Sequence, residues 1–148
     1  MTEPFVVRRE VEIAAPPATV FAFLTDPDKL LGWLGTEATM EPHAGGLYLV
    51  KVGGTNTARG RFTEVIPVHR LAYTFGWDGR EKTPPGSGLI EIDLIDRNPG
   101  TTLRLTHSGL PDVEECASHE KGWAHYLGRL AVAASGGDPG PDRMKDKH

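Results

Sequence analysis

The fold is decided by residues 112–137, DVEECASHEKGWAHYLGRLAVAASGG. Asp112 and Glu115 have the spacing of a capping box, in which two side chains satisfy backbone N–H groups of the first helical turn. Gly136 and Gly137 are typical of a helix C-terminus. Between these ends, apolar residues at steps of seven, four, three and four share one face of a helix roughly 30 Å long: Cys116, Trp123, Leu127, Leu130 and Ala134. The stretch predicts one long amphipathic helix.

The chain before this helix contains mainly strand candidates. In one of them, Leu103, Leu105 and His107 alternate with polar residues, which places all three side chains on one side of the strand. Alternation of this kind is typical of an antiparallel sheet with one face on a core and the other in water. The pattern predicts strands at residues 5–13, 36–40, 47–52, 58–66, 70–77, 89–96 and 101–107.

Two short helices are predicted between the first and second strands. The first follows Pro16 and Pro17, because proline is tolerated in a first helical turn. The second is expected over residues 28–33, with Asp26 as its cap. Together these elements predict an α+β helix-grip fold, in which a curved antiparallel sheet of about seven strands wraps around the long C-terminal helix.

This order of elements has consequences for the interior. The apolar face of the sheet needs a cover, and the C-terminal helix is the long amphipathic element that can supply it. A twisted sheet curling around a helix leaves a space between them, so an internal cavity is expected. We expect one domain over residues 1–137 and a disordered tail over residues 138–148, which is rich in proline, glycine and charge.

Composition excludes several classes of function. The 148 residues carry a net charge of −4 and no run of lysine or arginine, so a nucleic-acid partner is disfavoured. The single cysteine, Cys116, excludes an intramolecular disulfide and a multi-cysteine metal site. No stretch approaches the ~20 apolar residues of a membrane span. Because the N-terminus also lacks signal-peptide character, a cytoplasmic location is expected.

The order and motifs of the chain resemble those of the START and birch-pollen-allergen-like superfamily, which includes polyketide cyclases and aromatases. More narrowly, the chain is similar to bacterial proteins homologous to the C-terminal domain of the activator of the ninety-kilodalton heat-shock protein ATPase. The resemblance covers roughly residues 5 to 134 and is carried by residues 13–21, 30–33, 42–46, 60–65, 70–75, 100–103, 105–107, 109–110, 122–123 and 126–130. It implies a helix-grip fold with an internal cavity, but no single activity. Many relatives have two adjacent aromatic residues where this chain has Trp33 and Leu34.

The sequence contains few candidates for catalysis. His119-Glu120 begins like a zinc-protease helix, but Trp123 occupies the position of the second ligand. No phosphate-binding loop and no serine-hydrolase motif is present, and we expect neither a metal nor a cofactor. His107 points inward, toward the helix that carries Trp123. It is either a hydrogen-bonding or acid–base group at the cavity, or a strand-end histidine that caps a backbone or helix group.

Three functions remain open from the sequence. The first is a binding module that holds a small hydrophobic or aromatic molecule in the cavity. The second is a cyclase- or dehydratase-like enzyme with His107 as acid–base, and the third is a protein-interaction module like the co-chaperone relative. A homodimer is possible, and a chaperone contact has no specific motif to support it. The residues expected to line the cavity are Trp33, Tyr48, Phe62, Tyr73, Phe75, His107, Trp123 and Tyr126.

Overall fold

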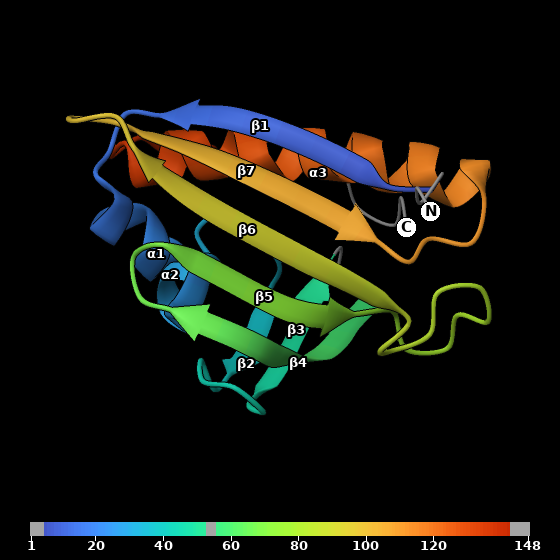
Figure 1. Cartoon of the computed structure of the whole chain (residues 1–148). Coiled ribbons are helices and arrows are strands. Elements are labelled where there is room, and N and C mark those ends of the chain that lie inside the picture. Colours follow the sequence, from blue (N-terminus) through green and yellow to red (C-terminus); the bar gives the residue numbers. More distant parts are fainter. Residues whose placement is uncertain (1–4, 53–55, 143–148) are drawn as a thin grey trace.

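The computed structural model describes residues 5–52 and 56–142 and confirms the predicted fold class (Figure 1). Three predictions fall at least in part outside the described residues. They concern the N-terminus at residues 1–4, which we expected to lack a signal peptide, the end of a strand at Gly53 and Gly54, and the tail at residues 143–148. The elements run in the order β1 (Val7–Ile13), α1 (Pro17–Thr25), α2 (Pro27–Leu30), β2 (Glu37–Met40), β3 (Leu47–Val52), β4 (Asn56–Ile66), β5 (Arg70–Phe75), β6 (Gly88–Asp96), β7 (Thr101–Ser108) and α3 (Val113–Ala134).

The strands form one antiparallel sheet of seven strands in the order β1-β7-β6-β5-β4-β3-β2. Each strand from β2 to β7 pairs with its neighbour in sequence, whereas β1 pairs with β7 at the far edge. Figure 1 shows α3 running along the β1–β7 side of the curved sheet, with α1 and α2 at one end. The sheet therefore wraps around α3, as a helix-grip fold requires.

Local capping sets the helix boundaries. The backbone N–H of Asp26 donates to Ala22 and ends α1, while the Asp26 carboxylate accepts from the backbone N–H of Asp28 at 2.9 Å and begins α2. At the start of α3, the Asp112 carboxylate accepts from the backbone N–H of Glu115 at 2.9 Å. Both caps were predicted, because an aspartate before a helical segment satisfies an otherwise unpaired N–H group.

Two predicted ends of elements were wrong by two or three residues, and the predicted starts of β1 (residue 5, observed Val7) and β4 (residue 58, observed Asn56) were wrong by two. The second helix ends at Leu30 rather than at residue 33. Strand β5 ends at Phe75, and Trp77 makes only an isolated bridge to Ala58. The reason for the second difference lies at Gly76, where a side chain would collide with the carbonyl of Pro84. The chain can approach this closely because glycine has no Cβ, and the returning loop takes Trp77 out of the ladder.

The loop between β5 and β6 is attached to the rest of the fold at both ends. The backbone N–H of Trp77 donates to the carbonyl of Thr83 at 2.7 Å. Lys82 forms an ion pair with the capping residue Asp112 at 2.6 Å, so the loop reaches the start of α3. The guanidinium of Arg80 lies over the Trp77 ring, 5.8 Å from its centre. This irregular loop thus packs against the end of the cavity described below.

The buried face of α3 is wider than the apolar pattern predicted. It also contains His119, which is 4% exposed, together with Gly122 and Tyr126. Cys116, by contrast, is only half-buried at the edge of this face. The helix therefore presents polar and small residues to the sheet as well as apolar ones, and these are the residues that build the site.

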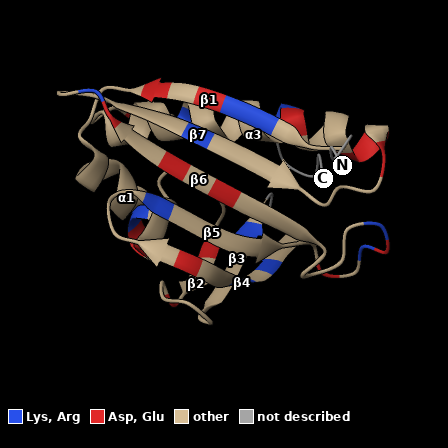
Figure 2. Ribbon diagram, in the orientation of Figure 1, with Lys and Arg blue, Asp and Glu red and all other residues tan. Residues whose placement is uncertain are grey.

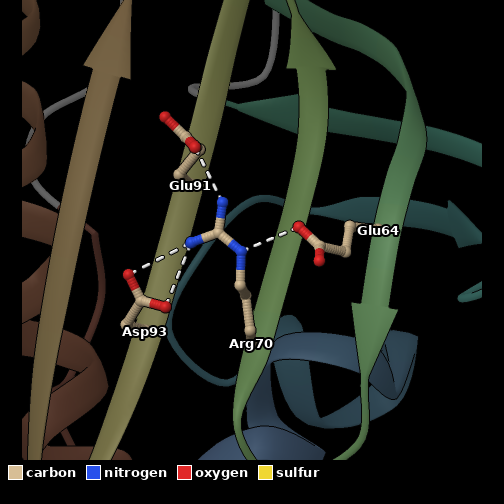
Figure 3. A network of polar contacts seen from close by, with 4 residues as sticks. All are labelled: Glu64, Arg70, Glu91 and Asp93. Atoms are coloured by element: carbon tan, nitrogen blue, oxygen red, sulfur yellow. Dashed lines mark hydrogen bonds and ion pairs between the residues drawn. The ribbon is translucent and has the colours of Figure 1, made fainter.

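Charged residues occur along the sheet, and β1, β4 and β6 carry most of them (Figure 2). Their centre is Arg70 on β5, which binds three carboxylates on the neighbouring strands β4 and β6 (Figure 3). The distances are 2.8 Å to Glu64, 2.7 Å to Glu91 and 3.0 Å to Asp93. Hydrogen bonds to these three groups raise the pKa of the guanidinium, with Glu64 the largest cause.

Replacing Arg70 by leucine is expected to lower the free energy of unfolding by about 1–3 kcal/mol, because three carboxylates would then face one another without a cation. The matched control is Arg104→Leu, whose single partner is Glu10 and whose side chain is 56% exposed. That loss should stay within ~0.5 kcal/mol. Urea unfolding of both variants checks the prediction. Equal losses for the two arginines would contradict it.

Candidate functional site

A small cavity lies between α3 and strands β3, β4 and β5. Its volume is about 30 Å³, which is about the share of one water molecule in the liquid. Aromatic rings supply most of the wall, and small residues at positions 58 and 122 leave the space open. The lining residues are Leu34, Tyr48, Val52, Ala58, Phe75, Trp77, His119, Gly122, Trp123 and Tyr126.

Two buried tryptophan–histidine pairs stand side by side at this cavity. The indole N–H of Trp77 donates to Nε2 of His119 at 3.0 Å, and the indole N–H of Trp123 donates to Nδ1 of His107 at 3.0 Å. On its other side, Nδ1 of His119 donates to the carbonyl of Glu115 at 2.8 Å. These bonds fix the neutral forms, with the ring proton on Nδ1 in His119 and on Nε2 in His107.

Burial keeps both histidines uncharged. It is the main reason that the pKa of His107 falls to about 3, and the nearby His119 lowers it further. Burial also lowers the pKa of His119. The two rings lie perpendicular with centres 5.0 Å apart, so a proton on one would repel a proton on the other. A general acid–base near neutral pH needs a pKa near 7, which His107 lacks.

The tyrosines near the cavity form a second cluster. Tyr48 and Tyr73 stack with ring centres 4.1 Å apart, and their hydroxyl groups are hydrogen-bonded. Burial raises the pKa of Tyr48 to about 12. Phe62 packs edge-on against both rings. These side chains continue the aromatic wall into the sheet, and they remain neutral at every physiological pH.

The segment after α3 packs back onto the helix. Asp142 accepts hydrogen bonds from the Tyr126 hydroxyl and from His125, the latter at 2.9 Å. Arg129 donates to the carbonyl of Gly140 at 2.9 Å and to that of Trp33 at 3.0 Å. Residues 138–142, which we expected to belong to a disordered tail, thus contact α3 beside the cavity.

A family model described as activator of Hsp90 ATPase homolog 1-like protein matches residues 14–135. The chain belongs to this family. The match spans the helices, the cavity walls and most of the sheet, so the family assignment and the fold rest on the same residues. It also confirms the resemblance noted in the sequence. A search of the curated proteins found no match.

Solved structures of similar proteins agree with this assignment. An AHSA1-like protein of Rhizobium etli, solved by solution NMR, is 66% identical over 97% of this chain and 90% of its own, with a TM-score of 0.77. DynU16, titled a putative protein in the dynemicin biosynthetic locus, is 26% identical over 91% of this chain and 49% of its own, with a TM-score of 0.79. The Aha1 dimer from Colwellia psychrerythraea is 21% identical over 89% of this chain and 97% of its own, with a TM-score of 0.78, and shows the fold alone.

Four of the eight residues that the sequence indicated line the cavity of this AHSA1-like chain, namely Tyr48, Phe75, Trp123 and Tyr126. The other four do not. His107 lies behind Trp123 as its hydrogen-bond acceptor, and Phe62 and Tyr73 lie behind Tyr48. Trp33 donates its indole N–H to the carbonyl of Phe23 at 2.9 Å and joins the end of α2 to α1.

Sequence reasoning missed six lining residues in this family member: Leu34, Val52, Ala58, Trp77, His119 and Gly122. A signal for His119 was present, because His119, Trp123, Tyr126 and Leu130 are spaced by four, three and four residues. That spacing also defines one helix face. Because this face contains a histidine and a glycine, its apolar pattern is weaker than that of the face we predicted to be buried. Trp77 and His119 are 42 positions apart, so no local pattern joins them.

Within residues 5–52 and 56–142, no group of three or more metal-binding side chains comes together. In the same part of the chain, no helix has the length and apolarity to span a membrane. The apolar cavity under α3 is the candidate functional site.

Proposed function

We propose that this AHSA1-like protein binds a small hydrophobic or aromatic molecule in the cavity between the sheet and α3. The observation that carries the proposal is the cavity itself, whose wall contains five aromatic rings. Burying apolar ligand surface there would contribute ~25 cal/mol per Å². Pockets built in this way are typical of small-molecule sites.

The volume of about 30 Å³ describes a closed form of the site. A ligand of even one ring needs more room, so binding must be accompanied by outward movement of a wall. Two lining residues lie outside the strands and α3, namely Trp77 in the loop after β5, which is bonded to His119, and Leu34 in the connection between α2 and β2. Its neighbour Trp33 is held to α3 through one hydrogen bond from Arg129. This wall is the one with the fewest constraints from regular structure.

The glycines of α3 provide a matched test of the site. Gly122 lines the cavity on the face between His119 and Tyr126, so Gly122→Ala adds a methyl group to a space of about 30 Å³. Gly128 is exposed, and a Cβ there meets nothing within 4 Å. Both substitutions favour the helix by ~1 kcal/mol.

We expect Gly122→Ala to weaken the binding of naphthalene at least tenfold and Gly128→Ala to leave it unchanged. The binding is followed through NMR signals of the indole N–H groups of Trp77 and Trp123, which lie at the cavity. The indole N–H of Trp33, which donates to Phe23, reports separately on movement of the wall beside Leu34. Equal affinities in both variants would contradict binding in this cavity.

Native mass spectrometry of the purified protein, followed by denaturing extraction, tests whether a natural ligand is carried along. A stoichiometric apolar molecule in the wild-type protein, reduced in Gly122→Ala, is the expected result. A molecule retained equally by both proteins would place its site elsewhere.

The two alternative functions find less support. His107 as acid–base is disfavoured by its position behind Trp123 and by its occupied Nδ1. For an interaction module, a broad exposed apolar patch is expected. Among the described residues, the large exposed apolar side chains are Ile66, Val113 and Val132, which lie on β4 and at opposite ends of α3. A homodimer, a chaperone contact and a cytoplasmic location stay predictions.

A further inference from the structure

We infer that the ligand of this cavity is an uncharged, planar aromatic molecule that carries at most one small polar group such as a hydroxyl. The inference rests on the proposed function and specifies the chemical class of ligand. It follows from how the polar atoms of the wall are already used, and from how the rings are oriented around the space.

The nitrogen atoms at the cavity are already committed to partners within the protein. The indole N–H groups of Trp77 and Trp123 donate to His119 and His107. His119 uses its second nitrogen on the carbonyl of Glu115. A ligand that took one of these partners would break a buried bond and leave a polar group unsatisfied, which weakens binding.

The oxygen atoms at the cavity leave few positions for hydrogen bonds to a ligand. The hydroxyl of Tyr126 donates to Asp142, and that of Tyr48 is hydrogen-bonded to Tyr73. A phenolic hydroxyl both donates and accepts, so the hydroxyl of Tyr48 can make one bond besides that to Tyr73. The wall can therefore satisfy a single hydroxyl-sized group, but it cannot satisfy a carboxylate or a chain of several hydroxyl and carbonyl groups.

The wall also lacks a charge that could balance a charged ligand. Within residues 5–52 and 56–142, its lining includes no lysine, arginine, aspartate or glutamate, and both nearby histidines are neutral. An ion transferred into such a place without a partner is strongly disfavoured. The same burial that lowers the pKa of His107 would act against a ligand carboxylate by raising its pKa.

The shape of the wall favours a flat ring. Phe75 stands between two indoles, edge-on to Trp77 at 5.3 Å and tilted against Trp123 at 6.2 Å. Tyr48 closes the other side, tilted against Phe75 at 6.4 Å. Aromatic pairs prefer edge-to-face and offset arrangements with centres 4.5–7 Å apart. A planar ring can continue this arrangement, whereas a bulky aliphatic molecule would have to separate the rings.

The experiment compares naphthalene with 2-naphthoate, which has the same rings and one added carboxylate. Each is titrated into the full chain at pH 7.5 while the indole N–H signals of Trp77, Trp123 and Trp33 are recorded. We expect naphthalene to shift the first two signals, whereas the signal of Trp33 reports on the wall beside Leu34. We expect 2-naphthoate to bind at least tenfold more weakly.

The outcomes distinguish the inferred class of ligand from the proposed binding in the cavity. If 2-naphthoate binds as tightly as naphthalene and shifts the signals of Trp77 and Trp123, the cavity binds ligands but the inferred class is wrong. If neither compound shifts these two signals, the proposed binding function itself is wrong. If naphthalene shifts them in the wild-type protein, binds Gly122→Ala at least tenfold more weakly, and binds the wild-type protein at least tenfold more tightly than 2-naphthoate does, both statements stand.

Discussion

Replacing Trp123 by alanine is expected to lower the free energy of unfolding by about 3–5 kcal/mol. Trp123 is 7% exposed on the buried face of α3, and its ring packs against Phe75 with centres 6.2 Å apart. Truncation leaves a void between helix and sheet. It also removes the donor to His107, which is buried and would lose the hydrogen bond on Nδ1.

Trp123→Phe separates the two contributions. This variant keeps most of the ring volume and loses the indole N–H, so we expect a smaller loss of about 1–3 kcal/mol from the unsatisfied nitrogen of His107. Chemical unfolding of both variants in urea provides the measurement. If Trp123→Ala retained nearly all of its stability but bound no naphthalene, the ring would be a ligand contact with little structural role.

Acidification is expected to destabilise the protein by about 3 kcal/mol between pH 6.5 and pH 4 through His107 alone. Its pKa is about 3 in the folded protein and near the ordinary 6.5 in the unfolded chain. Between these values the unfolded chain binds more protons, so stability rises with pH. The contribution is fully present above pH 6.5 and is lost as the pH falls toward 3. His119, whose pKa is also lowered, adds to the loss in the same direction.

His107→Asn isolates this contribution. The amide oxygen of asparagine can accept the bond from Trp123 in place of Nδ1, and the amide does not titrate. The variant should therefore lose about 3 kcal/mol less than the wild-type protein over the same pH range, whatever its stability at pH 7. Free energies of unfolding measured at half-unit intervals of pH give both slopes. Parallel curves would show that His107 is not buried in its neutral form.

Local patterns were enough to predict most of the fold. The alternation of side chains along a strand and the spacing of apolar residues along a helix are properties of neighbouring residues. They correctly predicted the order of the elements and both aspartate caps. They also placed His107 on the inner side of its strand, opposite Trp123. The error at Phe75 arose because the close approach of Gly76 to Pro84, which no local pattern shows, ends the strand early.

The candidate site was predicted only in part, and the misses have a common cause. The sequence showed which side of the sheet each aromatic residue faces, but Phe62 and Tyr73 face the interior as Tyr48 and Phe75 do. Only the curvature of the sheet places one pair at the cavity and the other behind it. Likewise, Gly122 and Gly128 lie in the same helix, and it is the rotation of α3 about its own axis that places Gly122 at the cavity and Gly128 away from it.

The sequence by itself thus determined the order of the elements, the inner face of each and the presence of a cover over the sheet. The tertiary structure alone decided that Trp77 pairs with His119, that Trp123 pairs with His107, and that the two indole N–H groups at the cavity are thereby bonded within the protein. The physical reason is one of range. Periodicity reflects the geometry of a few neighbouring residues, whereas a hydrogen bond across 42 positions depends on how strands and helix pack together.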